Sequence, residues 1–109
     1  MKKSYRDDIE NLALVGRRIG IKHSVWSVRD ITSDYILRRN IPMRFRKNKL
    51  VYRVHWGQDP VEADMTGVVS WADLWLLADR LVGESGDRHH CFIEVFKVKG
   101  DNLEMETGS

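Results

Sequence analysis

The clearest pattern of apolar and polar positions lies at residues 71–82 and predicts an amphipathic helix. Its apolar residues recur at intervals of three and four, which places them on one helical face: Trp71, Leu74, Trp75, Ala78, Leu81 and Val82. Ser70 is a suitable N-cap, Asp73 follows it with the spacing of a capping box, and Gly83 is placed to end the helix. We expect this helix to be the scaffold of the fold.

A second helix is predicted near the N-terminus, over residues 5–15. Ser4 and Asp7 have the spacing of a capping box, with Asp in place of Glu, and Gly16 follows as a stop signal. One helical face collects these residues: Tyr5, Ile9, Leu12 and Ala13.

Alternating residues predict strands on both sides of a short helical turn. Residues 18–31 are β-prone and are expected to hold one or two strands. Residues 32–39 form the predicted turn, and Pro42 prevents a helix from continuing past it. Residues 41–66 are predicted to form a three-stranded meander, with a strong turn signal at 57–60.

A C-terminal hairpin follows the main helix. Residues 91–96 are apolar on nearly both faces, as in an interior strand, and residues 100–102 form a turn. The last strand alternates and directs Glu104 and Glu106 outward, which is typical of an edge strand. The predicted fold is therefore a small single α+β domain, residues 1–109. An antiparallel sheet, the meander plus the hairpin, packs against one main helix, and an N-terminal helix is added.

Composition narrows the class of protein without naming a function. A chain of 109 residues with 42% hydrophobic and 31% charged residues suits one globular domain. The single cysteine, Cys91, cannot form an internal disulfide, which fits a reducing compartment. No apolar segment has the length of a signal-peptide core or of a membrane span. The expected location is cytoplasmic, with no membrane partner.

The small net charge of +2 conceals an uneven distribution along the chain. Residues 1–56 hold 14 basic and 5 acidic residues, whereas residues 57–109 hold 4 basic and 11 acidic residues. This asymmetry fits a polarised surface with an anionic partner on one side. It equally fits two halves that pack together and neutralise each other.

A run of cations over residues 38–53 is the strongest candidate binding site. The residues are Arg38, Arg39, Arg44, Arg46, Lys47, Lys49 and Arg53. Arginine offers a planar fork to phosphate or carboxylate oxygens, and the interleaved Phe45 and Tyr52 could stack on nucleic-acid bases. The alternative is a solvated hairpin whose aromatic rings face the core, and the alternation of Phe45 and Tyr52 with the charges favours it. No nucleic-acid-binding motif accompanies the run.

Other candidate sites have weaker signals. His89 and Cys91 would share one strand face, but a zinc site needs three or four ligands, and only His23 and His55 remain. The segment 83–87 lacks the Lys-Ser/Thr pair of a Walker loop and reads as a helix-to-strand connector. The acidic residues of the main helix and the preceding strand are expected on solvated faces: Glu62, Asp64, Asp73 and Asp79.

Tryptophan is abundant, with residues Trp26, Trp56, Trp71 and Trp75. The favoured interpretation places them in the core. Because Trp is enriched at binding hot spots, and Trp71 falls in the first helical turn, Trp71 is also a candidate interface residue.

No catalytic set emerges, and neither a metal nor another cofactor is expected. The favoured hypothesis is a non-enzymatic binding module, an inhibitor or accessory protein whose basic surface binds an acidic protein. The first alternative is a protein that binds nucleic acid or a phosphorylated ligand. The second is a small metal-dependent enzyme that uses His89 and Cys91. In size and in its lack of a catalytic set the chain resembles small phage-encoded accessory and inhibitor proteins. This resemblance rests on general properties and on no sequence motif. The oligomeric state is left open.

Overall fold

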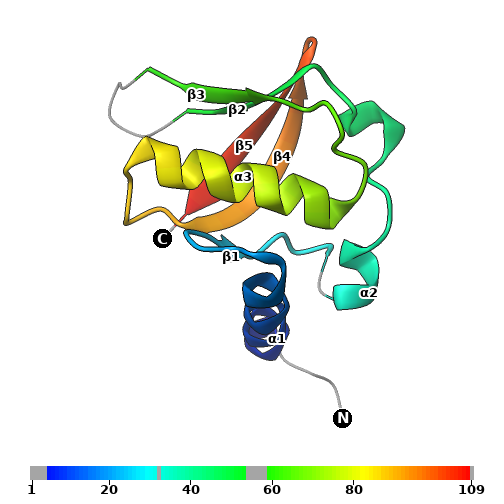
Figure 1. The fold of residues 1–109 in the computed structure, drawn as a ribbon, viewed down its shortest axis with the longest axis vertical. Coiled ribbons are helices and arrows are strands. Elements are labelled where there is room, and N and C mark those ends of the chain that lie inside the picture. The colour runs from blue at the N-terminus through cyan, green and yellow to red at the C-terminus, as the bar shows by residue number, and fades with distance from the viewer. Residues whose placement is uncertain (1–4, 32, 54–58, 109) are drawn as a thin grey trace.

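The computed structural model describes residues 5–31, 33–53 and 59–108, and for residues 5–9 the backbone alone. Figure 1 shows the arrangement of the elements. In chain order they are α1 (Tyr5–Ile19), β1 (Val25–Trp26), α2 (Asp34–Leu37), the 3-10 helix η1 (Met43–Phe45), β2 (Lys49–Tyr52), β3 (Val61–Asp64), α3 (Trp71–Ser85), β4 (Phe92–Lys99) and β5 (Asn102–Gly108).

The strands of this part of the chain form one curled sheet in the order β1-β4-β5-β2-β3. The hairpins β2–β3 and β4–β5 are antiparallel, as predicted. However, β1 runs parallel to β4 and β2 runs parallel to β5, so the sheet is mixed. The α+β class is confirmed, and the purely antiparallel sheet is corrected. The β2–β5 pair is parallel because α3, which connects β3 to β4, returns the second hairpin across the sheet so that β5 enters beside β2.

The prediction that the last strand forms an edge is wrong, because β5 lies between β4 and β2. Its outward acids instead form ion pairs across the neighbouring strands. Glu104 lies 3.4 Å from the Arg53 guanidinium, and Glu106 lies 3.0 Å from the Lys97 ammonium. Alternating charge identifies the solvent face of a strand but not its place in the sheet.

The predicted meander is reduced to the β2–β3 hairpin. Its first strand is replaced by η1, in which the Phe45 N–H donates to the Pro42 carbonyl at 2.9 Å and the Arg46 N–H donates to Met43 at 3.0 Å. These local bonds leave the segment without a strand partner. Half of the predicted turn at 57–60, residues 57 and 58, lies outside the described residues together with Trp56.

Helix α1 continues past its predicted end because Gly16 serves packing and does not stop the helix. A Cβ on Gly16 would lie 2.5 Å from the Trp75 ring, so only glycine permits this approach to α3. The helix ends at Gly20, which has φ of +101°, and the Ile21 N–H donates to the Gly16 carbonyl at 2.9 Å. This is a Schellman ending. The predicted cap residue Ser4 lies outside the described residues.

Helix α3 begins as predicted and ends later than predicted. The Ser70 hydroxyl accepts from the Asp73 N–H, and the Asp73 carboxylate accepts from the Ser70 N–H, which confirms the capping box. The helix passes through Gly83 to Ser85 and ends at Gly86, which has φ of +74°. Gly83 is required for another reason, since a Cβ there would lie 2.5 Å from the His23 ring.

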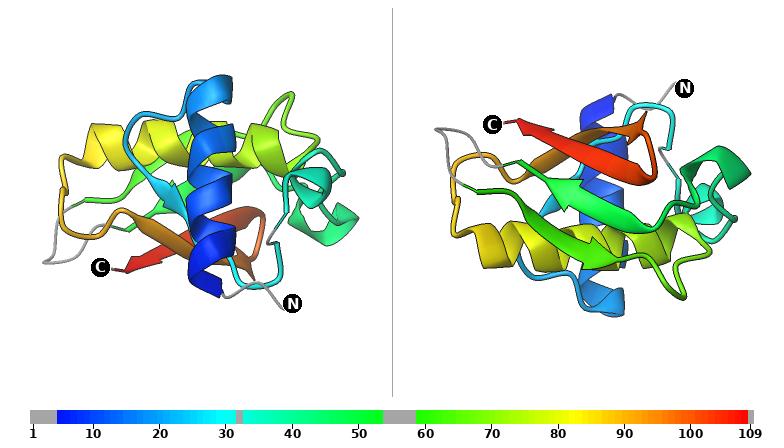
Figure 2. Two further views of the ribbon diagram at one scale, coloured as in Figure 1. Left: turned by 90° about the horizontal axis from the view of Figure 1, so that it is seen from below. Right: turned by 90° about the horizontal axis from the view of Figure 1, so that it is seen from above.

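The core lies between α3 and the concave face of the sheet, and α1 closes it from the β1 side (Figures 1 and 2). Trp26 lies at its centre, with ring centroids 5.4 Å from Trp75, 6.2 Å from Trp71 and 5.8 Å from Phe96. The core placement of these tryptophans is confirmed. None of the described helices is long and apolar enough to cross a membrane.

Candidate functional site

The cations of the predicted binding site are divided between two parts of the fold. Arg38, Arg39, Arg44, Arg46 and Lys47 lie on the segment that holds α2 and η1. Lys49 and Arg53 lie on or directly after β2, on the face of the sheet that points away from α3. The sequence run is therefore not a single structural unit.

The two β2 cations are already neutralised by acids of neighbouring strands. The Lys49 ammonium donates to a Glu62 oxygen at 2.9 Å, and this hydrogen bond raises the pKa of Lys49. The Arg53 guanidinium forms an ion pair with Glu104 at 3.4 Å. Exposed pairs of this kind add little stability, but they cancel the charge that a partner would meet. We therefore remove Lys49 and Arg53 from the candidate site.

The remaining cations lie among large exposed apolar side chains. Tyr35 is 66% exposed and Met43 is 75% exposed, although both belong to a well-anchored segment. Arg39, Arg44 and Arg46 are exposed on the same segment, residues 35–46. We call these five side chains, Tyr35, Arg39, Met43, Arg44 and Arg46, the basic–aromatic surface. Lys47, in the same segment, is half-buried. Arg38 forms a weak, highly exposed ion pair with Asp34 at 3.8 Å.

Two arginines of the basic–aromatic surface rest on aromatic rings. The Arg39 guanidinium lies 5.4 Å from the centre of the Tyr35 ring, and the Arg44 guanidinium lies 4.9 Å from that of Phe45. Among the described residues, neither arginine forms an ion pair. A stacked guanidinium keeps its N–H edges free for a carboxylate, so both are oriented and available.

The backbone beneath this surface is fixed to α3 and to the β4–β5 turn. The Ile41 N–H donates to the Val69 carbonyl at 2.9 Å, and the Trp71 N–H donates to the Arg39 carbonyl at 3.0 Å. The Asn48 N–H donates to the Asp101 carbonyl at 2.9 Å. Buried Leu37 and Ile41 hold the segment from below. The exposed side chains therefore project from a rigid base.

The aromatic residues proposed for contact with a ligand are part of the core. Trp71 is only 8% exposed, and its ring meets the rings of Trp26, Phe45 and Phe96, so burial limits what it can offer to a partner and its role as an interface residue stays a prediction. Tyr52 is fully buried, and burial raises the pKa of its hydroxyl. Phe45 is half-buried edge-on against Trp71. The stacking of nucleic-acid bases on Tyr52 is therefore excluded.

The histidine–cysteine segment forms a local turn around Asp87. The Asp87 carboxylate accepts from the backbone N–H groups of His89 and His90 at 2.8 and 3.1 Å, and lies 2.8 Å from the His90 Nδ1. Cys91 is half-buried, and desolvation raises the pKa of its thiol, which lowers its nucleophilicity. The described residues hold no group of three metal-ligating side chains, and His55 lies outside them.

Asp87 should give the fold an acid-sensitive contribution. The hydrogen bond from the His89 N–H, followed by that from the His90 ring, lowers its pKa to about 2. This pKa lies below the pKa of an Asp in the unfolded chain, about 3.9. The stability that the Asp87 carboxylate contributes is therefore fully present above about pH 4 and is lost as the pH falls toward 2. We expect the difference in unfolding free energy between the wild type and Asp87→Asn to shrink over this range in urea titrations. Asp101→Asn is the matched control, and a difference that does not vary with pH would contradict the assignment.

Two important features were not predicted from the sequence, although the first of them had a signal there. The first is the exposure of Tyr35 and Met43, and its signal was the presence of these two apolar side chains within a basic segment. Asp79 was expected on a solvated face but is 5% exposed. Its carboxylate accepts from the N–H groups of residues 22–24, which no pattern within α3 itself could show.

Comparison of the chain with models of known families, with curated proteins and with solved structures returned no match.

Proposed function

We propose that this protein is a non-enzymatic binding module, an inhibitor or accessory protein that binds an acidic protein partner through the basic–aromatic surface. The observation that carries the proposal is the exposure of Tyr35 and Met43 among arginines that no carboxylate neutralises within the described residues. Arg, Tyr and Met are enriched at the centres of protein interfaces.

The stacked arginines support this proposal because they reduce the entropic cost of association. A free arginine loses rotamer freedom when it is immobilised, at a cost of about 0.5–1.5 kcal/mol for each such side chain. Arg39 and Arg44 are already held against rings, and the backbone beneath them is anchored to α3. Carboxylates on the partner would then form bidentate pairs with arginines that are already oriented.

The structure of this segment favours a protein over nucleic acid as the partner. Two of the predicted phosphate-binding cations are paired with glutamates, and Tyr52 is buried. Met43 has the highest exposure among the large exposed apolar residues, 75%, and suits an apolar contact better than a phosphate backbone. Nucleic-acid binding stays as the alternative that the experiment below can detect.

The test is capture of a partner from lysate of the source cells by immobilised protein, after nuclease treatment. The wild type is compared with the double variant Arg44→Glu/Arg46→Glu and with the matched control Lys97→Glu/Lys99→Glu on the open sheet face. We expect one acidic protein in near-stoichiometric amount with the wild type and the control. Retention by the Arg44/Arg46 variant should fall tenfold or more, because the reversed charges face the partner's acids.

Three results would contradict the proposal. One is the absence of any stoichiometric protein, and another is equal retention by both double variants. The third is loss of binding on nuclease treatment, together with a steep fall in affinity for an oligonucleotide as salt rises, which would establish the nucleic-acid alternative.

A further inference from the structure

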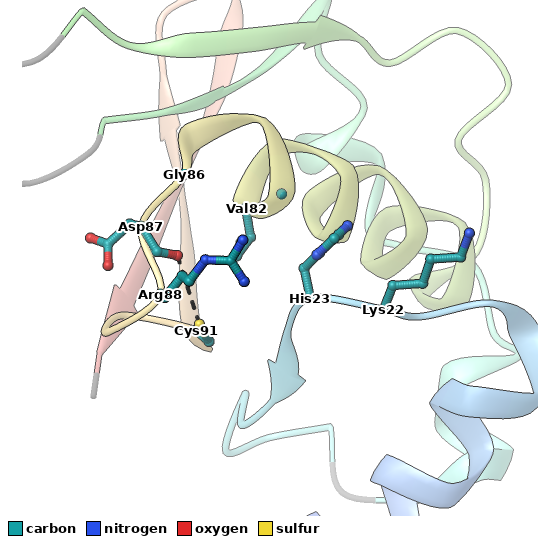
Figure 3. Close-up of a pocket in the computed structure, with 8 residues that line it drawn as sticks. Lys22, His23, Val82, Gly86, Asp87, Arg88 and Cys91 are labelled. Carbon is teal, nitrogen blue, oxygen red and sulfur yellow. Dashed lines mark hydrogen bonds between the residues drawn. The ribbon is translucent and has the colours of Figure 1, made fainter.

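A pocket of about 260 Å³ opens at the C-terminal end of α3, at the opposite end of that helix from the basic–aromatic surface (Figures 1 and 3). Three chain segments meet around it: the link between α1 and β1, the end of α3, and the turn before β4. The lining side chains include Lys22, His23, Val82, Arg88 and Cys91. We call this cavity the His23 pocket.

Cationic and hydrogen-bond-donating side chains line the His23 pocket. Figure 3 shows the Arg88 guanidinium pointing across Val82 toward the side of the pocket where His23 lies. The His23 ring leans toward α3, and the Lys22 side chain extends outward on the far side of His23. In the part of the chain that the structure describes, none of the three forms an ion pair. Their charge is therefore available to a ligand.

The carboxylates nearest the His23 pocket are engaged elsewhere. Asp79 accepts from the backbone N–H groups of Lys22 and His23 at 2.9 and 2.8 Å, so its charge is satisfied beneath the pocket wall. The Asp87 carboxylate turns away from the pocket in Figure 3, toward the backbone N–H groups of the following turn. Neither acid contacts the cations directly.

One wall of this pocket, the His23 ring and the backbone of residues 22–23, is held in place before any ligand arrives. The His23 ring rests against α3 at Gly83, where a Cβ would come within 2.5 Å of it. The backbone that carries Lys22 and His23 is fixed by Asp79. Such preorganisation lowers the cost of binding.

We propose that the His23 pocket binds the phosphate group of a small phosphorylated molecule. The Arg88 fork and the His23 ring N–H donate to phosphate oxygens, and Lys22 adds positive charge. The volume suits a phosphate group and not a whole drug-sized ligand. A second, more open pocket of about 430 Å³ shares Lys22, His23 and Gly83 and extends along α3 over Leu76 and Arg80. It provides room for the rest of the molecule.

The test is titration of the full chain with inorganic phosphate, adenosine 5′-monophosphate and adenosine, followed by calorimetry and by the NMR signal of the His23 ring. We expect the nucleotide to bind and to shift the His23 signal, and adenosine not to bind. Arg88→Ala and Lys22→Ala should each weaken binding tenfold or more, since each removes a charged contact. Lys99→Ala, an exposed cation on the sheet, should leave binding unchanged.

If inorganic phosphate binds and the nucleotide does not, the ligand of the site is the free phosphate ion. If the nucleotide binds and inorganic phosphate does not, the ligand is a phosphate ester. The proposal is overturned if neither binds at about 10 mM, which excludes even weak affinity. It is also overturned if adenosine binds equally well, or if Arg88→Ala and Lys99→Ala behave alike. Arg44→Glu/Arg46→Glu should bind phosphate normally, so this site and the proposed function can fail independently.

Discussion

Asp79→Ala should destabilise the fold by about 3–5 kcal/mol, because it removes the single buried acceptor of four part-buried hydrogen bonds. The side chain is 5% exposed and accepts hydrogen bonds from the N–H groups of Lys22, His23 and Ser24 at 2.8–2.9 Å. The Ser24 hydroxyl donates to it at 2.6 Å. That hydroxyl in turn accepts from the Trp75 indole N–H at 3.1 Å, so the loss extends into the core.

The measurement for this variant is the free energy of unfolding in urea. Asp79→Asn keeps one carbonyl acceptor and should fall between the wild type and Asp79→Ala. Asp64→Ala removes an exposed acid from β3 and should change stability by no more than about 0.5 kcal/mol. A loss of less than about 1 kcal/mol for Asp79→Ala would show that the carboxylate does not anchor residues 22–24.

Trp71→Ala should cost about 3–5 kcal/mol, the range for a large aromatic side chain removed from a packed core. The Trp71 ring lies 5.8 Å from that of Phe45 and 6.4 Å from that of Phe96, measured between centroids. Because Phe45 supports Arg44, the cavity should also loosen the basic–aromatic surface. The expected result is a large fall in unfolding free energy together with weaker partner binding.

Trp71→Phe separates a core role from an interface role. A phenyl ring retains much of the packing against Phe45, so most of the stability and all of the partner binding should return. Leu76→Ala tests a partly exposed side chain on the same helix and should cost no more than about 0.5 kcal/mol. Loss of partner binding by Trp71→Phe at near-normal stability would establish Trp71 as a contact residue.

The elements with local signals could be predicted from the sequence. The capping box at Ser70, the apolar face of α3 and the turn before β5 are all determined by neighbouring residues, and each appears in the structure. The order of the strands depends on contacts between distant segments, and alternation does not encode it. For this reason the parallel pairs and the central position of β5 were missed.

Glycine gave misleading stop signals for a physical reason. Gly16 and Gly83 both lie inside helices, where each provides space for a ring from another segment, Trp75 and His23 respectively. The residues that end the helices are Gly20 and Gly86, which adopt positive φ. A sequence shows that glycine is present but not whether it serves conformation or close packing.

The candidate site was predictable in part. The basic segment was evident from composition, but ion pairing with Glu62 and Glu104 depends on strand neighbours. The His23 pocket joins residues far apart in the chain, such as His23 and Arg88, and the sequence contains no motif for it.

The most direct test of the central claim is the rate at which the captured partner associates with this protein. Wild type, Arg44→Glu/Arg46→Glu and Lys97→Glu/Lys99→Glu are compared by surface kinetics at low and physiological salt. We predict that the Arg44/Arg46 variant associates at least tenfold more slowly at low salt, that its dissociation rate changes less, and that the difference narrows as salt rises. Equal association rates for the wild type and both variants would contradict binding through the basic–aromatic surface.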